Sequence, residues 1–327
     1  MNLTFNTQSS LILILFYLAN LTISQPTIAD DIIIIKTPKE CFDEIEDYPF
    51  KENHLTISPQ LSMHYVDEGD KDAPVVLLLH GEPSWSYAYR NVIPALVKSG
   101  YRVIAPDLIG FGKSDKLIQP NSHTYSGHTL WLKSFIHQLN LRNINVFAHD
   151  WGGMLALRVI AHEPQLFSKV IISNAFLFTG YESFPESFVQ WQQYSQKDKK
   201  FNVGTISDWG SYTKLTNSIK WAYNAPFPSE KHKTAARRFP MLIPAHKNDP
   251  EAIINLELRE SLKTFSKPFL TVWSSHEDKM WQGKDTILQT EISGAKGQNH
   301  KVLKAGHFIQ EDQSFKLTEI MLEFFSN

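Results

Sequence analysis

The segment Ala148–Gly153 reads AHDWGG and places a carboxylate where a nucleophile would be exposed. An apolar run at 144–147 precedes this segment, and an apolar-periodic run at 154–160 follows it. The pattern predicts a strand, a sharp turn and a helix, and small residues at the turn let strand and helix backbones pack closely. Such a turn exposes one side chain at the end of a sheet. The sequence therefore predicts Asp150 as a nucleophile, although a short motif of this kind can also simply turn the chain.

A carboxylate nucleophile differs from an alkoxide in the reaction that it favours. It can displace a leaving group from a saturated carbon and leave an ester, which water then cleaves. The next residue, Trp151, carries an indole that offers one N–H donor and no acceptor. That donor suits a departing anion better than an oxygen that needs a proton. The pair indicates displacement of an anionic leaving group.

A second turn could supply backbone donors to the same site. The buried-type strand at 75–79 runs into His80–Gly81–Glu82. A His-Gly loop at this point commonly gives one backbone N–H to an anion hole, and the residue after the nucleophile gives the other. We therefore expect the oxyanion hole to consist of the N–H groups of Glu82 and Trp151. His80 and His149, which adjoin these motifs, are expected to support turns.

The motifs HGEPSWSYAYR (80–90), APDLIGFGKSDK (105–116) and HDWGG (149–153) together resemble one branch of the haloalkane dehalogenases, within the α/β-hydrolase superfamily. Further matching blocks lie at 36–38, 48–50, 224–228 and 305–311, so the resemblance covers most of the chain after residue 29. It implies an α/β fold with a mostly parallel central sheet flanked by helices and an inserted helical cap. It also implies hydrolysis of halogenated alkanes through a covalent ester on Asp150, without a metal or organic cofactor.

The superfamily's chain order of nucleophile, acid and histidine guides the search for the other catalytic residues. His307 follows a strand-like segment at 301–304, and an imidazole with an ordinary pKa of about 6.5 can take a proton from water. We predict His307 as the base.

The acid should follow the strand-like segment 268–273, where two carboxylates compete. An Asp-Lys dipeptide like that of some relatives favours Asp278, whereas ungapped counting favours Glu277; we choose Asp278, also because Asn174 is neutral at the alternative position after 169–173.

The cap is predicted at 176–246, where aromatic, proline and lysine residues interrupt the alternation of strands and helices. The resembling branch places a second halide-binding tryptophan there, and Trp191 fits the local pattern best. Trp209 and Trp221 are expected to be packing residues, because an aromatic in a helical stripe usually belongs to a core. The remaining ranges, 30–175 and 247–327, form the predicted main domain.

Composition is consistent with one catalytic unit. Hydrophobic residues make up 42% of the chain, enough to bury a large core, and the formal net charge of -2 argues against a partner that is a polyanion such as nucleic acid. No histidine and cysteine spacing demands a metal. The expected partners are a small apolar halogenated substrate, water and the halide product, and the protein is expected to be a monomer.

The N-terminal region predicts that the protein is exported. An apolar run at 11–19 and the small residues before Asp30 resemble a secretory signal peptide covering 1–29, although no Lys or Arg precedes the run. The run is short for a membrane span, so none is expected after cleavage. The only cysteine, Cys41, cannot form a disulfide within the chain. We expect a periplasmic or secreted protein.

Two other functions are compatible with parts of the pattern. An epoxide hydrolase would share the aspartate and the histidine but needs cap tyrosines to protonate the opening ring, and the available ones are Tyr181, Tyr194, Tyr212 and Tyr223. A receptor of the same fold without catalysis usually lacks a member of the triad. Halide release from a bromoalkane, diol formation from an epoxide, or ligand binding without turnover would distinguish the three.

Overall fold

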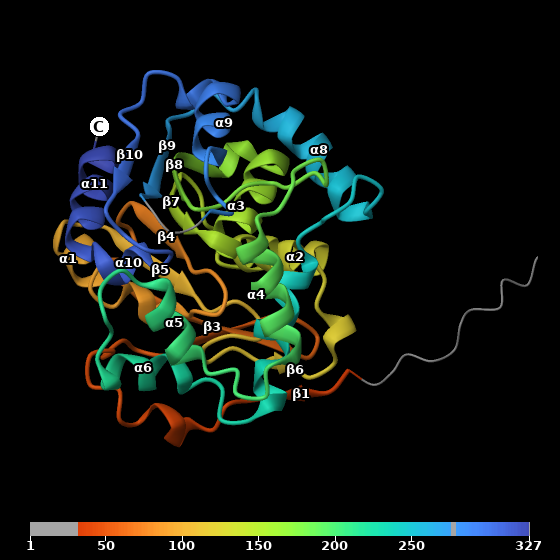
Figure 1. Ribbon diagram of the computed structural model, residues 1–327. Coiled ribbons are helices and arrows are strands. Elements are labelled where there is room, and N and C mark those ends of the chain that lie inside the picture. The colour runs from red at the N-terminus through yellow and green to blue at the C-terminus, as the bar shows by residue number, and fades with distance from the viewer. Residues whose placement is uncertain (1–31, 276–278, 327) are drawn as a thin grey trace, which may run out of the picture. The chain divides into compact units, whose positions relative to one another are not determined.

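A single mixed sheet organises the described part of the chain. The computed structural model describes residues 32–275 and 279–326 (Figure 1). Within them, the larger sheet has eight strands in the order β10-β9-β8-β7-β4-β5-β3-β2. The strands are β2 (Asn53–Ser58), β3 (Leu61–Glu68), β4 (Val75–Leu79), β5 (Arg102–Pro106), β7 (Ile144–His149), β8 (Phe167–Ser173), β9 (Phe269–Ser274) and β10 (Lys301–Leu303). A smaller sheet pairs β1 (Ile34–Ile35) with β6 (Lys116–Leu117).

Strand direction follows the expected pattern. Every neighbouring pair from β10 to β5 is parallel, and only β3 runs antiparallel to its neighbours β5 and β2. The whole of β7 is buried, as is β4 apart from its first residue, which explains why these strands appear as continuous apolar runs instead of alternating patterns. The predicted α/β fold with a mostly parallel sheet is confirmed.

Helices lie on both sides of this sheet (Figure 1). One group contains α1 (Ile93–Lys98) and α11 (Ser314–Ser326), which contact each other. The other contains α2 (Tyr125–Gln138), α3 (Asp150–His162) and α8 (Pro250–Leu262), with α3 in contact with both. Helix α9 (Lys284–Glu291) packs beside β9, and the short α10 (Ile309–Asp312) precedes α11. The core therefore lies between the sheet and its two helical layers.

A further set of helices lies in the chain between β8 and α8. It consists of α4 (Glu186–Lys197), α5 (Val203–Gly210), α6 (Asn217–Asn224) and α7 (Thr234–Arg238). We call these four helices, with the 3₁₀ turn at Phe239–Leu242, the cap. Gly180 lies against the backbone of His246, so the chain enters and leaves the cap at neighbouring points. In the cap, α4 contacts α7, whereas α5 contacts α6.

Candidate active site

The nucleophile elbow joins β7 directly to α3. Asp150 is the first residue of α3 and has a φ of 51°, a left-handed conformation that few non-glycine residues adopt. A Cβ on Gly152 would lie 2.5 Å from the carbonyl oxygens of Leu79 and His80, so only glycine permits this approach of α3 to the end of β4. The elbow therefore presents the Asp150 side chain at the carboxyl end of the central strands.

The Asp150 carboxylate is held by the neighbouring turn. The backbone N–H of Glu82 donates a hydrogen bond of 2.8 Å to Asp150 Oδ1. The other oxygen, Oδ2, lies 3.7 Å from His307 Nε2. The two oxygens therefore differ: Oδ1 accepts a backbone hydrogen bond, and Oδ2 faces the histidine. The structure thus brings together three of the predicted residues, Glu82, Asp150 and His307.

His307 is carried by the loop between β10 and α10. Its backbone carbonyl accepts a hydrogen bond of 2.8 Å from His149 Nε2, and the two imidazole rings lie 4.8 Å apart. A carbonyl only accepts, so Nε2 of His149 must carry the proton. Burial, and next the nearby His307, hold the pKa of His149 well below its ordinary value. His149 therefore positions the loop as a neutral group.

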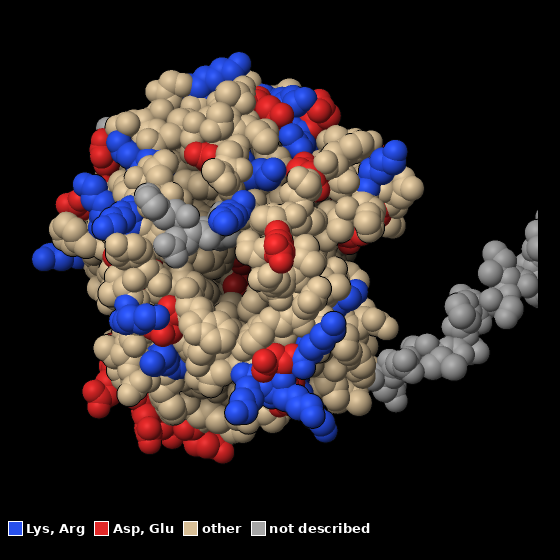
Figure 2. Space-filling model, in the orientation of Figure 1, with Lys and Arg blue, Asp and Glu red and all other residues tan. Residues whose placement is uncertain are grey.

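A cavity of about 440 Å³ opens above these side chains. Its acid and base groups are Glu82, Asp150 and His307, and most of the remaining wall is apolar. The other lining residues are Pro83, Trp151, Ser187, Phe188, Trp191, Ile206, Trp209, Gly210, Pro240, Ile243, Met280, Trp281 and Phe308. Figure 2 shows a hollow between the parts of the surface over α4 and α5, with acidic side-chain atoms at its bottom.

The tryptophans of this cavity differ from those of the core. Trp85 and Trp273 each donate their Nε1–H to a backbone carbonyl. In the described part of the structure, by contrast, the Nε1–H groups of Trp151 and Trp191 have no protein acceptor. Trp151 is buried, and its ring is fixed by Tyr125 and Phe239, with ring centroids 4.9 and 4.6 Å away. Fixed indole donors without an acceptor can bind an anion in an apolar cavity.

Comparison with known proteins agrees with this geometry. The family described as alpha/beta hydrolase fold matches residues 74–314. A haloalkane dehalogenase of Psychrobacter cryohalolentis is 44% identical over 89% of this chain and 97% of its own length. Haloalkane dehalogenase 1 of Mycobacterium tuberculosis is 36% identical over 89% and 98%. The chain belongs to the haloalkane dehalogenases.

A solved structure supports the same assignment. The haloalkane dehalogenase DpaA of Paraglaciecola agarilytica, described as tetrameric, superposes with a TM-score of 0.83 at 32% identity. The superposition covers 90% of this chain and 99% of that one. This haloalkane dehalogenase therefore shares its fold with DpaA over most of its length.

The predicted acid falls in a part of the dehalogenase that cannot be described. Asp278 and Glu277 both lie outside the described residues, so the choice between them stays a prediction. The flanking geometry is clear: β9 ends at Ser274 beside β10, and Ser275 N–H donates a hydrogen bond of 2.8 Å to the carbonyl of Leu303. The loop that follows β9 therefore starts beside the strand that leads to His307.

Two tryptophans lie where sequence reasoning did not place them. Trp209 was expected to be a packing residue, and this is wrong, because it lines the cavity and its surface is 62% exposed. Trp281 lines the same cavity but was not considered at all. Its position directly after the predicted acid loop was the available signal. Trp221 is not among the lining residues.

The Glu82 side chain was also missed, since only its backbone N–H had been given a role. The side chain is 6% exposed, and its Oε1 has no hydrogen-bond partner in the described structure. Burial, and next the charge of Asp150, raise the pKa of this carboxyl well above its ordinary value. Glu82 therefore adds a buried polar group, held toward its neutral form, to the wall of the cavity.

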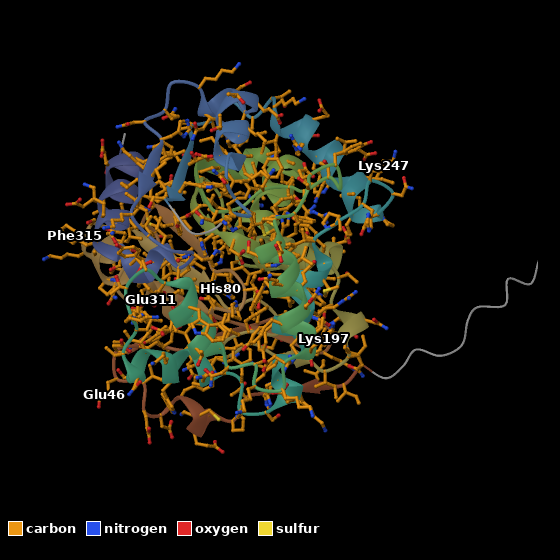
Figure 3. The ribbon with its side chains drawn as sticks, in the orientation of Figure 1. Glu46, His80, Lys197, Lys247, Glu311 and Phe315 are labelled. Atoms are coloured by element: carbon orange, nitrogen blue, oxygen red, sulfur yellow. The ribbon has the colours of Figure 1, made fainter. Side chains whose placement is uncertain are left out.

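His80 supports its turn, as expected. It lies in the interior, near the centre of the view in Figure 3, while Lys197 and Lys247 lie toward the outside. Its Nδ1–H donates to the carbonyl of Gly81 at 2.9 Å, and its Nε2 accepts from the N–H of Leu108 at 2.9 Å. The imidazole thus joins the loops that follow β4 and β5. Because both ring nitrogens are occupied, His80 has no free group for catalysis.

The described residues contain neither a metal-binding cluster nor a membrane-spanning helix. Among residues 32–275 and 279–326, no cluster of at least three histidine, cysteine or acidic side chains is arranged to hold a metal ion. The same residues include no helix with the length and apolarity that crossing a bilayer requires.

Proposed function

We propose that this protein hydrolyses the carbon–halogen bond of small apolar haloalkanes to an alcohol, a halide ion and a proton. The observation that carries the proposal is the shared cavity, in which the Asp150 carboxylate and His307 imidazole meet unpaired indole donors of Trp151 and Trp191. An apolar wall suits the substrate, and the donors suit the anion that leaves.

The first step is a displacement by Asp150. Oδ2 attacks the halogen-bearing carbon in line, a carbon–oxygen bond forms, and the carbon–halogen bond breaks with both electrons leaving on the halide. The Nε1–H groups of Trp151 and Trp191 bind the developing halide. Oδ1 is already held by Glu82 N–H and becomes the carbonyl oxygen of the alkyl ester.

The second step is hydrolysis of that ester. His307 Nε2 takes a proton from water, and the resulting hydroxide attacks the carboxyl carbon of Asp150. The negative charge then develops on Oδ1, which the N–H groups of Glu82 and Trp151 stabilise. Collapse of the intermediate releases the alcohol and restores the carboxylate. The net reaction consumes one water and releases one halide and one proton.

Replacing the base tests this sequence of steps. We expect a His307→Gln variant to complete the displacement but not the hydrolysis, so a bromoalkane adds the mass of its alkyl group to the Asp150 peptide. The double variant with Asp150→Asn is the control and should gain no mass. Sustained bromide release by the His307→Gln variant would refute the assigned base.

The cavity does not favour the epoxide alternative. The cap tyrosines expected to protonate an opening epoxide ring are not among the described lining residues of the cavity. Tyr181 and Tyr212 are exposed, and the buried Tyr223 donates to Glu311 at 2.5 Å. Absence of diol formation from an epoxide, alongside bromide release from a bromoalkane, is the expected result.

We infer that Asp278 orients His307 in the folded enzyme. Its sequence position after β9 and the neutral residue Asn174 after β8 support this choice over Glu277. Asp278→Asn should slow ester hydrolysis and Glu277→Gln should not. The reverse result would move the role to Glu277.

We further infer export through a signal peptide at 1–29 and action as a monomer in the periplasm or outside the cell. The composition of the N-terminal region supports export. N-terminal sequencing of the protein recovered outside the cytoplasm should begin at Asp30, and light scattering should give the mass of one chain. A tetramer like that described for DpaA would correct the second inference.

A further inference from the structure

A second depression adjoins the active-site cavity. It has a volume of about 580 Å³, and we call it the outer groove. Its lining residues are Tyr194, Asp198, Lys200, Phe201, Asn202, Thr205, Trp209 and Lys233. Trp209 lines both the outer groove and the active-site cavity. Trp209 therefore lies between the active-site cavity and the outer groove.

One side of the outer groove is aromatic. The rings of Tyr194 and Trp209 lie 5.8 Å apart, and those of Tyr194 and Phe201 lie 5.9 Å apart. Trp191, which lines the active-site cavity, stacks on Tyr194 at 5.8 Å. Aromatic side chains thus continue from the inner cavity to the surface, and an alkyl chain could lie along them.

Basic residues also line the outer groove. Lys200 has no ion pair or side-chain hydrogen bond within the described structure. Lys233 binds Glu230 at 2.8 Å, and Arg237 binds the same carboxylate at 2.7 Å, so one acid faces two bases. The Asp198 carboxylate accepts a hydrogen bond of 2.6 Å from the Lys200 backbone N–H. These five groups carry a net charge of about +1 when all are ionised.

A helix end adds to this positive potential. Asn202, the N-cap of α5, and Thr205 both line the groove. The N-terminal end of a helix carries a partial positive charge that favours anions. Figure 2 shows basic side chains, mixed with a few acidic ones, on the part of the surface below the hollow.

We propose that the outer groove binds the anionic end of an elongated substrate, which makes ω-haloalkanoates a substrate class of this enzyme. The halogen-bearing end lies in the apolar cavity, the alkyl chain passes Trp209, and the carboxylate lies near Lys200 and Lys233. The inference rests on the proposed dehalogenase function and deepens it by naming the substrate's far end. The reaction at Asp150 is unchanged.

The test compares kcat/KM for ω-bromoalkanoates of increasing chain length with kcat/KM for the corresponding primary amides at low ionic strength. We expect the carboxylate to be preferred above a threshold length and the preference to fall as salt is added. The measured quantity is the ratio of kcat/KM for the carboxylate to kcat/KM for the amide. Lys200→Met should lower this ratio about threefold, the effect of losing an exposed ion pair, and Lys200→Glu should lower it further. Lys214→Met is the matched control, because Lys214 is an exposed cap lysine outside the groove, and it should leave the ratio unchanged.

Equal kcat/KM for acid and amide at every length would overturn the inference, and so would a ratio that Lys200→Glu does not alter. Bromohexane, which has no anionic end, separates this outcome from failure of the proposed function. If bromohexane releases bromide while the ratio stays at unity, only the groove assignment is wrong. If bromohexane and every ω-bromoalkanoate are inert, the dehalogenase function and this inference fail together.

Discussion

At the scale of single residues, the site divides the work between the two oxygens of Asp150. Glu82 N–H holds Oδ1, and Oδ2 faces His307 at 3.7 Å. In the proposed mechanism, this asymmetry assigns the attack to Oδ2 and the later oxyanion to Oδ1. A nucleophile without a fixed carboxylate plane would need to reorient between the two steps, which would add to the barrier of the second.

The indole donors lead to a prediction at this scale. Trp151→Phe and Trp191→Phe keep an aromatic ring but remove the N–H, so each should lower kcat/KM for a bromoalkane about 10- to 100-fold, the range for a lost hydrogen bond to an ion. Steady-state bromide release measures the loss. Trp221→Phe, which changes an indole away from the cavity, is the control. Full activity in both cavity variants would show that other groups bind the halide.

At the scale of elements, hydrogen bonds from backbone N–H groups connect the chain after α5 to the loop that carries His307. The Asp312 carboxylate in α10 accepts from the N–H groups of Tyr212 and Thr213 in the turn after α5, at 2.8 and 2.7 Å. It also accepts from Gly306 N–H at 2.9 Å, next to His307. Phe308 N–H donates to the carbonyl of Gly210 at 3.2 Å. One carboxylate therefore fixes His307 relative to the cap.

We predict that Asp312→Asn slows ester hydrolysis more than ester formation, because it loosens the loop that carries the base and leaves Asp150 in place. The alkyl-enzyme should accumulate, and kcat should fall about tenfold, the effect of losing one charge-assisted hydrogen bond. Rapid-quench mass spectrometry follows the ester. Asp208→Asn is the matched control, since Asp208 accepts from Leu215 N–H in the turn after α5 but, among the described residues, has no hydrogen bond to the loop that carries His307. Equal accumulation in both variants would contradict a positioning role.

The elements also show which parts of the site could be predicted from sequence. The elbow and the Glu82 turn depend on local patterns, namely an apolar run followed by small residues, so Asp150 and its backbone donor were placed correctly. The position of Trp209 depends on how α5 meets the rest of the protein. Two partners of Asp312, Tyr212 and Thr213, lie about 100 positions earlier in the chain. Helical periodicity carries no information about such contacts. The sequence therefore did not predict that Trp209 lines the cavity or that Asp312 holds the loop that carries His307.

At the scale of the whole molecule, buried neutral histidines connect the cap to the main domain. His123 Nε2–H donates to the carbonyl of Leu117 at 3.0 Å, which leaves Nδ1 to accept from His128 Nε2–H at 3.0 Å. His128 packs on Phe239 of the cap, with ring centroids 4.5 Å apart, and Phe239 packs on Trp151. The bond between the two rings requires an unprotonated Nδ1 on His123, so protonation of His123 would break it and disturb the packing behind the Trp151 indole.

This pair makes stability depend on pH in a defined direction. Burial lowers the pKa of His123 to about 4 and, together with His123, holds the pKa of His128 well below its ordinary value. Unfolded histidines bind protons below about pH 6.5, whereas the folded His123 stays neutral to about pH 4 and burial also keeps the folded His128 from binding a proton near its ordinary pKa. The unfolded state therefore gains protons first, and the free energy of unfolding should decrease as pH falls through this window.

We predict that His128→Gln reduces this loss, because the amide can still donate to His123 Nδ1 but does not titrate. The slope of the unfolding free energy between about pH 6.5 and about pH 4 should decrease by about 1.4 kcal/mol per pH unit, the contribution of one proton. Urea unfolding at a series of pH values measures the slope. His246→Gln, which changes an exposed histidine at the base of the cap, serves as the control. If His128→Gln leaves the slope unchanged, acid destabilisation arises at other groups, and the histidine pair does not set the lower pH limit of the fold.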